Sequence, residues 1–255
     1  MKKADIHCHL WRGEGALERL VEECRKHEIT KVFMSSTGRQ HDQYANEEVL
    51  EAAARYPELI LPAAWVHLDR ETSREVEAYA RAGFRGLKVI DPLLPYNHPN
   101  YASVYAAAAR MQLPILFHCG IKARVREGVP GRNENHRPIH LDDIARRYPG
   151  LRLVLAHIGT PWHDEAFMVA RLNPNVFIEL TSGSGWRPKG MDGGYFRRKL
   201  WWDGAWKKVL FGTDVRPERT GWAVRVYQEL LEDAGLDEAS QADVYYNNFL
   251  RLWES

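Results

Sequence analysis

Two histidines stand two positions apart near the start of the chain, in the stretch Asp5-Ile6-His7-Cys8-His9. Alternate side chains of a β-strand point to the same face, so His7 and His9 share a face if this stretch is a strand. Two imidazoles on one face can bind one divalent metal ion at about 2 Å each. Taken alone the pair is a weak signal, because two polar residues at a strand edge are common.

Three further residues that can bind a metal or move a proton stand where apolar stretches run out. They are His118, His157 and Asp214. A single histidine at a strand end has an ordinary structural explanation. Polar groups of this kind at four strand ends, counting the histidine pair, are hard to explain by packing. The sequence therefore predicts a metal centre built from strand ends.

These residues need elements that bring distant strand ends together. Short apolar stretches rich in β-branched residues alternate with amphipathic stretches along the chain. The expected strands are 4–10, 31–36, 59–66, 84–90, 113–120, 151–159, 176–182 and 208–214. The expected helices are 13–27, 44–56, 72–82, 101–111, 141–148, 164–172, 195–202, 221–234 and 238–252.

Strands that alternate with helices form parallel βαβ units. Eight such units in about 250 residues predict an α/β protein with a (β/α)8 TIM barrel, as a single domain over residues 1–255. The first and last strands of a closed barrel are neighbours, so His7, His9 and Asp214 would converge. An open doubly wound sheet is the alternative. It fits less well, because no glycine-rich phosphate-binding turn follows the first strand.

The composition restricts the partners. Lys and Arg number 35 and Asp and Glu number 34, so the net charge is +1 and no basic excess is present for binding nucleic acid. No run of apolar residues is long enough for a transmembrane helix, and the charged start does not resemble a signal peptide. The three cysteines, Cys8, Cys24 and Cys119, are too sparse for a disulfide framework. We expect a reduced, cytoplasmic protein that acts on a small molecule.

The combined pattern resembles the amidohydrolase superfamily. The similar segments are 5–9 (Asp-Ile-His-Cys-His), 117–120 (Phe-His-Cys-Gly), 155–159 (Leu-Ala-His-Ile-Gly) and 211–214 (Phe-Gly-Thr-Asp). More narrowly, they resemble the amidohydrolase-related branch that includes aminocarboxymuconate-semialdehyde decarboxylase, γ-resorcylate decarboxylase and lactone hydrolases. Gly-Leu-Lys at 86–88 and Asn-Asn-Phe-Leu-Arg-Leu at 247–252 fit the same branch.

The resemblance implies the roles of the site residues. One divalent metal ion, zinc with manganese as the alternative, would be bound by His7, His9, His118 and Asp214. Asp214 would also take the proton of a metal-activated water. His157 would act as a neighbouring acid or stabilise developing negative charge.

Lys88 raises a rival arrangement, because a carboxylated lysine on the fourth strand bridges two metal ions in other branches of the superfamily. The one-metal centre is preferred, since the lysine of a Gly-Leu-Lys segment is not usually a ligand in the branch resembled here. The long polar connections 121–139 and 183–194 follow strands and would lie on the catalytic face of a barrel. Candidate substrate contacts are Trp11, Lys88, Arg124, Trp186 and Arg187, with the arginines pairing a carboxylate.

The expected function is that of a metal-dependent hydrolase acting on a small, carboxylate-bearing ester, lactone or amide. The first alternative is a non-oxidative decarboxylase that uses the same metal on an aromatic or dienoic acid. A catalytically silent barrel used as a binding protein is the third, and the intact ligand set argues against it. The dense tryptophan cluster at 201–206 has two explanations, a homodimer contact or the packing of a helix on the barrel.

Overall fold

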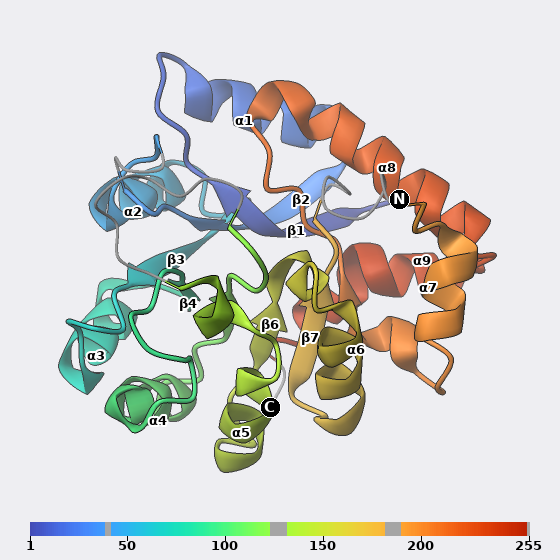
Figure 1. Cartoon of the computed structure of the whole chain (residues 1–255). Helices are drawn as coiled ribbons and strands as arrows, with labels where there is room; N and C mark the ends of the chain where they lie inside the picture. The colour runs from blue at the N-terminus through green and yellow to red at the C-terminus, as the bar shows by residue number, and fades with distance from the viewer. Residues whose placement is uncertain (39–41, 123–131, 182–189, 254–255) are drawn as a thin grey trace. The chain divides into compact units, whose positions relative to one another are not determined.

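A computed structural model describes residues 1–38, 42–122, 132–181 and 190–253 (Figure 1). Eight strands follow one another in the sheet in their order along the chain, β1 to β8, with helices between them. This order, with the parallel pairing of the neighbouring strands, is that of a (β/α)8 TIM barrel, and the predicted fold class is confirmed. The chain divides into two compact units, the first made of Met1–Trp65 and Glu179–Glu254 and the second of Val66–Ile178.

The first unit contains the two ends of the chain. Its strands are β1 (Lys3–His9), β2 (Ile29–Ser35), β3 (Ile60–Val66) and β8 (Val209–Leu210). The boundary of the unit falls after Trp65, so only the last residue of β3 belongs to the second unit. Its helices are α1 (Ala16–Lys26), α2 (Asn46–Arg55), α7 (Gly193–Lys199), α8 (Thr220–Asp233), α9 (Glu238–Ala242) and α10 (Asn248–Leu250). Helices α1 and α8 pack side by side (Figure 1).

Strand β1 lies between β2 and β8. It pairs with β2 in parallel, with His9 beside Ser35. On its other side, Ile6 N–H donates to the carbonyl oxygen of Phe211 at 3.0 Å, and Asp214 N–H donates to the carbonyl oxygen of His7 at 2.7 Å. The first and last strands of the barrel are therefore neighbours, as predicted.

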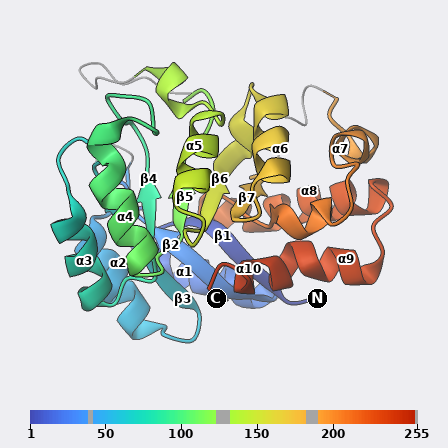
Figure 2. The same cartoon turned by 90° about the horizontal axis from the view of Figure 1, so that it is seen from below.

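The second unit contains the middle of the chain. Its strands are β4 (Gly86–Val89), β5 (Ile115–Phe117), β6 (Leu153–Leu155) and β7 (Val176–Glu179). The boundary of the unit falls after Ile178, so Glu179 at the end of β7 belongs to the first unit. Its helices are α3 (Ser73–Ala82), α4 (Ala102–Arg110), α5 (His140–Arg147) and α6 (His163–Leu172), and α3 packs beside α4 (Figure 2). The four strands pair in parallel and are buried along their whole length, which explains why they are mostly apolar in the sequence.

Several predicted strands are too long at their carboxyl ends. Strand β5 ends one residue before His118, β6 ends two residues before His157, and β8 ends four residues before Asp214. His157 and Asp214 have φ angles of 59° and 47°, in the left-handed region that no regular strand can contain. His118, His157 and Asp214 thus stand on the turns that leave the strands, whereas His7, His9 and Lys88 lie inside β1 and β4.

The last predicted helix, 238–252, is also divided. Helix α9 passes into a π-helical turn at Asp243–Asn247 and then into α10. Among the described helices, none is long and apolar enough to cross a membrane.

Candidate metal centre

Three side chains of the first unit converge at the carboxyl ends of β1 and β8. His9 Nε2 lies 3.1 Å from Asp214 Oδ1, and His7 Nε2 lies 3.8 Å from the same oxygen. The three donor atoms lie within 4.8 Å of one another. The side chains of His7 and His9 are 1% and 6% exposed, whereas that of Asp214 is 26% exposed. The group is therefore enclosed by protein on the histidine side and open on the carboxylate side.

A buried carboxylate fixes the backbone that carries this group. Asp5 Oδ1 accepts the N–H of His7 at 2.9 Å and the N–H of Thr213 at 3.0 Å, and Asp5 Oδ2 accepts the Thr213 hydroxyl at 2.6 Å. Burial raises the pKa of Asp5 to about 7, and these hydrogen bonds act in the opposite direction. Asp5 thus ties the strand of the histidines to the turn that ends in Asp214.

Both histidines turn Nδ1 toward an acceptor. His9 Nδ1 lies 3.3 Å from the carbonyl oxygen of Ser35, and His7 Nδ1 lies 3.2 Å from Glu179 Oε2. A carbonyl or carboxylate oxygen only accepts, so these contacts favour the tautomer with the proton on Nδ1 and a lone pair on Nε2, and the Ser35 hydroxyl, 3.2 Å from His9 Nδ1, can accept as well. Both Nε2 atoms face Asp214 Oδ1. Sequence reasoning missed Glu179 and Ser35, although a charged residue inside the apolar run Val-Phe-Ile-Glu-Leu is a signal that could have been used.

The donor set fits a divalent metal ion. Two unprotonated imidazole nitrogens and a carboxylate oxygen are ligands that zinc and manganese accept. Two ligand atoms at about 2 Å from a tetrahedral ion lie roughly 3.3 Å apart, close to the separations found here. Three ligands of this kind leave room in the coordination shell for a further protein ligand and for substrate or water.

The second unit holds another histidine group. His157 Nε2 lies 3.1 Å from His118 Nδ1, and their ring centres are 4.7 Å apart. The main chain of His118 is fixed from both sides, because its N–H donates to the carbonyl oxygen of Val89 and its carbonyl oxygen accepts the hydroxyl of Tyr96. The structure thus places the two predicted residues side by side at neighbouring strand ends. The roles predicted for them stay predictions.

His136, which the sequence gave no reason to select, belongs to the same group. It is buried, and its ring centre lies 5.3 Å from that of His118. Its Nε2 accepts the N–H of Asp91 at 3.2 Å, and burial lowers its pKa to about 4, so the ring is neutral at ordinary pH. The carboxylate of Asp91 pairs with Lys122. Lys88 is fully buried in β4.

Trp11 packs against the candidate metal centre. Its ring stands nearly perpendicular to that of His9, with the ring centres 5.8 Å apart, and its indole N–H donates to the carbonyl oxygen of Val215 at 3.0 Å. The guanidinium of Arg216 lies 4.8 Å from the centre of the Trp11 ring. Trp11 thus lies beside His9, and its predicted contact with substrate stays a prediction. Arg124, Trp186 and Arg187, also predicted to contact substrate, lie outside the described residues.

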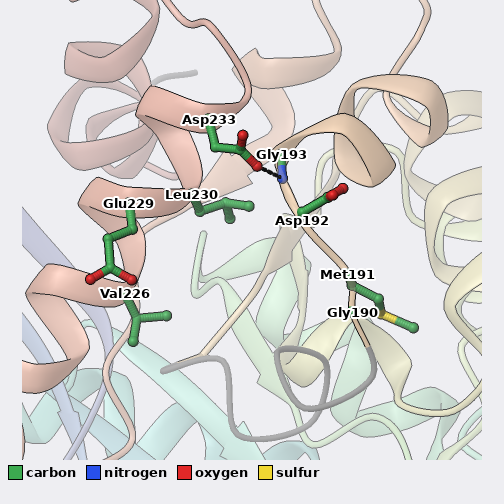
Figure 3. A pocket seen from close by; sticks show the side chains of 8 residues that line it. All are labelled: Gly190, Met191, Asp192, Gly193, Val226, Glu229, Leu230 and Asp233. Carbon is green, nitrogen blue, oxygen red and sulfur yellow. Dashed lines mark hydrogen bonds between the residues drawn. The ribbon is translucent and has the colours of Figure 1, made fainter.

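A separate pocket of about 280 Å³ lies between the start of α7 and helix α8 (Figure 3). Glu229 and Asp233 reach it from α8, and Asp192 stands at the start of α7. Two of these carboxylates have structural partners. Asp192 accepts the N–H of Tyr195 as the N-cap of α7, and Asp233 Oδ2 accepts the N–H of Gly193 at 2.6 Å. The second contact fastens the start of α7 to α8.

The sequence model of the amidohydrolase family matches residues 4–254, and the chain belongs to this family of enzymes. A search of curated proteins finds no match.

Several solved structures have the same fold. An uncharacterised TIM-barrel protein from Bordetella bronchiseptica is 16% identical, with a TM-score of 0.78 over 99% of this chain and 98% of that chain. A probable 2-pyrone-4,6-dicarboxylic acid hydrolase from Acinetobacter baumannii is 13% identical, with a TM-score of 0.72 over 99% of both chains. A dihydroxybenzoic acid decarboxylase from a Polaromonas species, with bound manganese and an inhibitor, is 15% identical, with a TM-score of 0.70 over 99% and 96%.

Proposed function

We propose that the chain is a metal-dependent hydrolase that acts on a small ester, lactone or amide bearing a carboxylate. The observation that carries the proposal is the convergence of His7 Nε2 and His9 Nε2 on Asp214 Oδ1. The histidines are buried while Asp214 is partly exposed, so substrate and water would approach from the carboxylate side. A carboxylate in this position can accept a proton from an attacking water molecule.

The proposed cofactor is one divalent metal ion, zinc or manganese. When bound, this ion would act as a Lewis acid that polarises a substrate oxygen and lowers the pKa of a bound water molecule. The manganese in the Polaromonas decarboxylase supports a divalent ion in this fold. From the sequence prediction, His118 is proposed as the fourth ligand and His157 as the neighbouring acid. Arg124 and Arg187 are proposed partners of the substrate carboxylate, with Trp186, Trp11 and Lys88 near them.

Decarboxylation of an aromatic or dienoic acid is the second candidate function. One observation supports it. The chain is about as similar to the decarboxylase structure, with a TM-score of 0.70, as to the hydrolase structure, with a TM-score of 0.72. The two reactions make different demands on the chain. Hydrolysis needs a group that takes a proton from water, which is the role proposed for Asp214. Decarboxylation needs a group that protonates the carbon atom left behind, and His157 could supply that proton.

One assay distinguishes the two reactions. The zinc-loaded or manganese-loaded chain is incubated in ¹⁸O-labelled water with a panel of carboxylated lactones and aromatic acids. The proposal expects acid release with one labelled oxygen in the product and no carbon dioxide. Carbon dioxide release, with no labelled oxygen in the organic product, would establish the decarboxylase instead. If metal and substrate bind but no product forms from any compound, the hydrolase proposal fails, and the result supports a catalytically silent binding protein.

A matched pair of variants connects the activity to the centre. His9→Asn removes a proposed ligand and should abolish turnover. His98→Asn serves as the control, because His98 caps a short helix by accepting the N–H of Asn100, which asparagine can also do. Equal activity in both variants would show that the reaction does not use this centre.

A further inference from the structure

We infer that Glu179 is a positioning residue for His7, and that Gly212 is a glycine because it makes room for Glu179. The carboxylate of Glu179 holds His7 in the tautomer with the proton on Nδ1, so that Nε2 faces Asp214. The inference deepens the proposed metal centre and rests on it for its functional meaning. Its geometry stands on the contacts of β7, β1 and the turn after β8.

Glu179 is a carboxylate at a fully buried position of the barrel. It ends β7, in a strand whose residues are all buried, and its own side chain is 0% exposed. Burying a carboxylate is unfavourable unless it is paired and hydrogen-bonded. Glu179 Oε2 lies 3.2 Å from His7 Nδ1, whose ring is itself buried. An apolar residue would stabilise the barrel at least as well, so the carboxylate is explained by what it does to His7.

Gly212 explains how the carboxylate fits. A Cβ atom at this position would lie 2.6 Å from Glu179 Cγ, 2.7 Å from Oε1 and 2.9 Å from Cδ, so any other residue would displace the side chain of Glu179. The backbone of Gly212 does not require glycine, since its φ lies outside the left-handed region. The glycine of the Phe-Gly-Thr-Asp segment is therefore needed for the close approach of Glu179 and not for a turn.

The two histidines reach the same tautomer by different means. His9 Nδ1 lies near two oxygens of Ser35, the main-chain carbonyl at 3.3 Å and the hydroxyl at 3.2 Å, and no side-chain substitution removes the carbonyl. His7 Nδ1 depends on a side chain 172 positions away in the sequence. Acceptors of this kind orient metal-binding histidines, and their loss commonly weakens metal binding about 10–100-fold. Glu179 and Gly212 can thus be changed without altering any proposed ligand.

The first test reads the tautomer of His7 in the metal-free protein by ¹⁵N NMR of the imidazole nitrogens. The wild-type chain should carry the proton of His7 on Nδ1. In Glu179→Gln the amide can turn its NH2 group toward Nδ1, and in Gly212→Ala the carboxylate is displaced. Both variants should therefore lose the fixed tautomer, while His9 keeps its own. Retention of the Nδ1–H tautomer of His7 in both folded variants would overturn the inference.

The second test measures zinc affinity by competition with a chromophoric chelator. Glu179→Gln and Gly212→Ala should each weaken zinc binding about 10–100-fold. Gly150→Ala is the matched control, because a Cβ there meets nothing within 4 Å and the residue has an ordinary φ. The double variant should bind zinc no more weakly than Glu179→Gln alone, since Gly212 acts through Glu179. Additive losses, or no loss, would assign Glu179 a merely structural role.

The two tests also separate this inference from the proposed function. If the wild-type chain binds no zinc or manganese but the variants lose the His7 tautomer, the metal centre is wrong and the positioning contact is supported. If zinc binds and neither the tautomer nor the affinity responds, the positioning contact is wrong and the metal centre stands.

Discussion

Asp214 and His157 have different surroundings, and the difference predicts different defects. Asp214 Oδ1 faces the Nε2 atoms of two histidines, whereas His157 faces His118. Asp214→Asn keeps an oxygen that coordinates weakly but removes the proton acceptor, so both metal content and kcat should fall. His157→Asn should keep its metal and lose about 10²–10⁴-fold in kcat, the range for an acid or an oxyanion-stabilising group.

The check is metal analysis and steady-state kinetics on the same preparation of each variant. A group that acts only in the transition state lowers kcat and kcat/KM together, which is the expected pattern for His157→Asn. Loss of metal from His157→Asn would make His157 a ligand and would favour a two-metal centre with Lys88.

Whole elements could be predicted from the sequence better than their ends. Buried parallel strands are continuous apolar runs, so the eight strands and their order followed from the pattern of apolar residues. The apolar runs continue past the strands, however, as Cys119 after His118 and Ile158 after His157 show. The left-handed backbone of His157 and the contact of Glu179 with His7 depend on distant parts of the chain, which no local pattern records.

The turn after β5 depends on a close approach to the turn after β6. Gly120 has a φ of 106°, and a Cβ there would lie 2.3 Å from the carbonyl oxygen of Thr160. Gly120→Ala should therefore lower the free energy of unfolding by about 2 kcal/mol or more. Urea denaturation of Gly120→Ala and the control Gly150→Ala tests this expectation. Equal stability of the two variants would contradict the close approach.

At the scale of the whole molecule, a bound ion would join residues far apart in the sequence. His7 and His9 lie on the first strand, and Asp214 follows the last. Zinc at about 1,000 times its Kd should add about 4 kcal/mol to stability. For a chain of this size that raises Tm by roughly 10 °C. Calorimetry with zinc and then with a chelator measures the shift, and His9→Asn should show none. An unchanged Tm in the wild-type chain would argue against binding to the folded state.

The predicted homodimer contact is also testable at this scale. Trp201, in the tryptophan cluster 201–206, is 64% exposed and is therefore available to a partner chain. Light scattering should give about twice the chain mass of 29.4 kDa, and Trp201→Ser should shift the population toward single chains. Leu172→Ser, at another exposed apolar residue, is the control. A wild-type mass of one chain would show that Trp201 has another role.

The pairing of β1 with the turn after β8 has a consequence for biosynthesis. The strand with His7 and His9 leaves the ribosome about 200 residues before Asp214 does. At about 5–20 residues per second, the two histidines wait on the order of 10–40 s for their carboxylate partner. Throughout that time β1 lacks one of its two neighbours. An ion held by all three side chains could therefore bind only after Asp214 has been made.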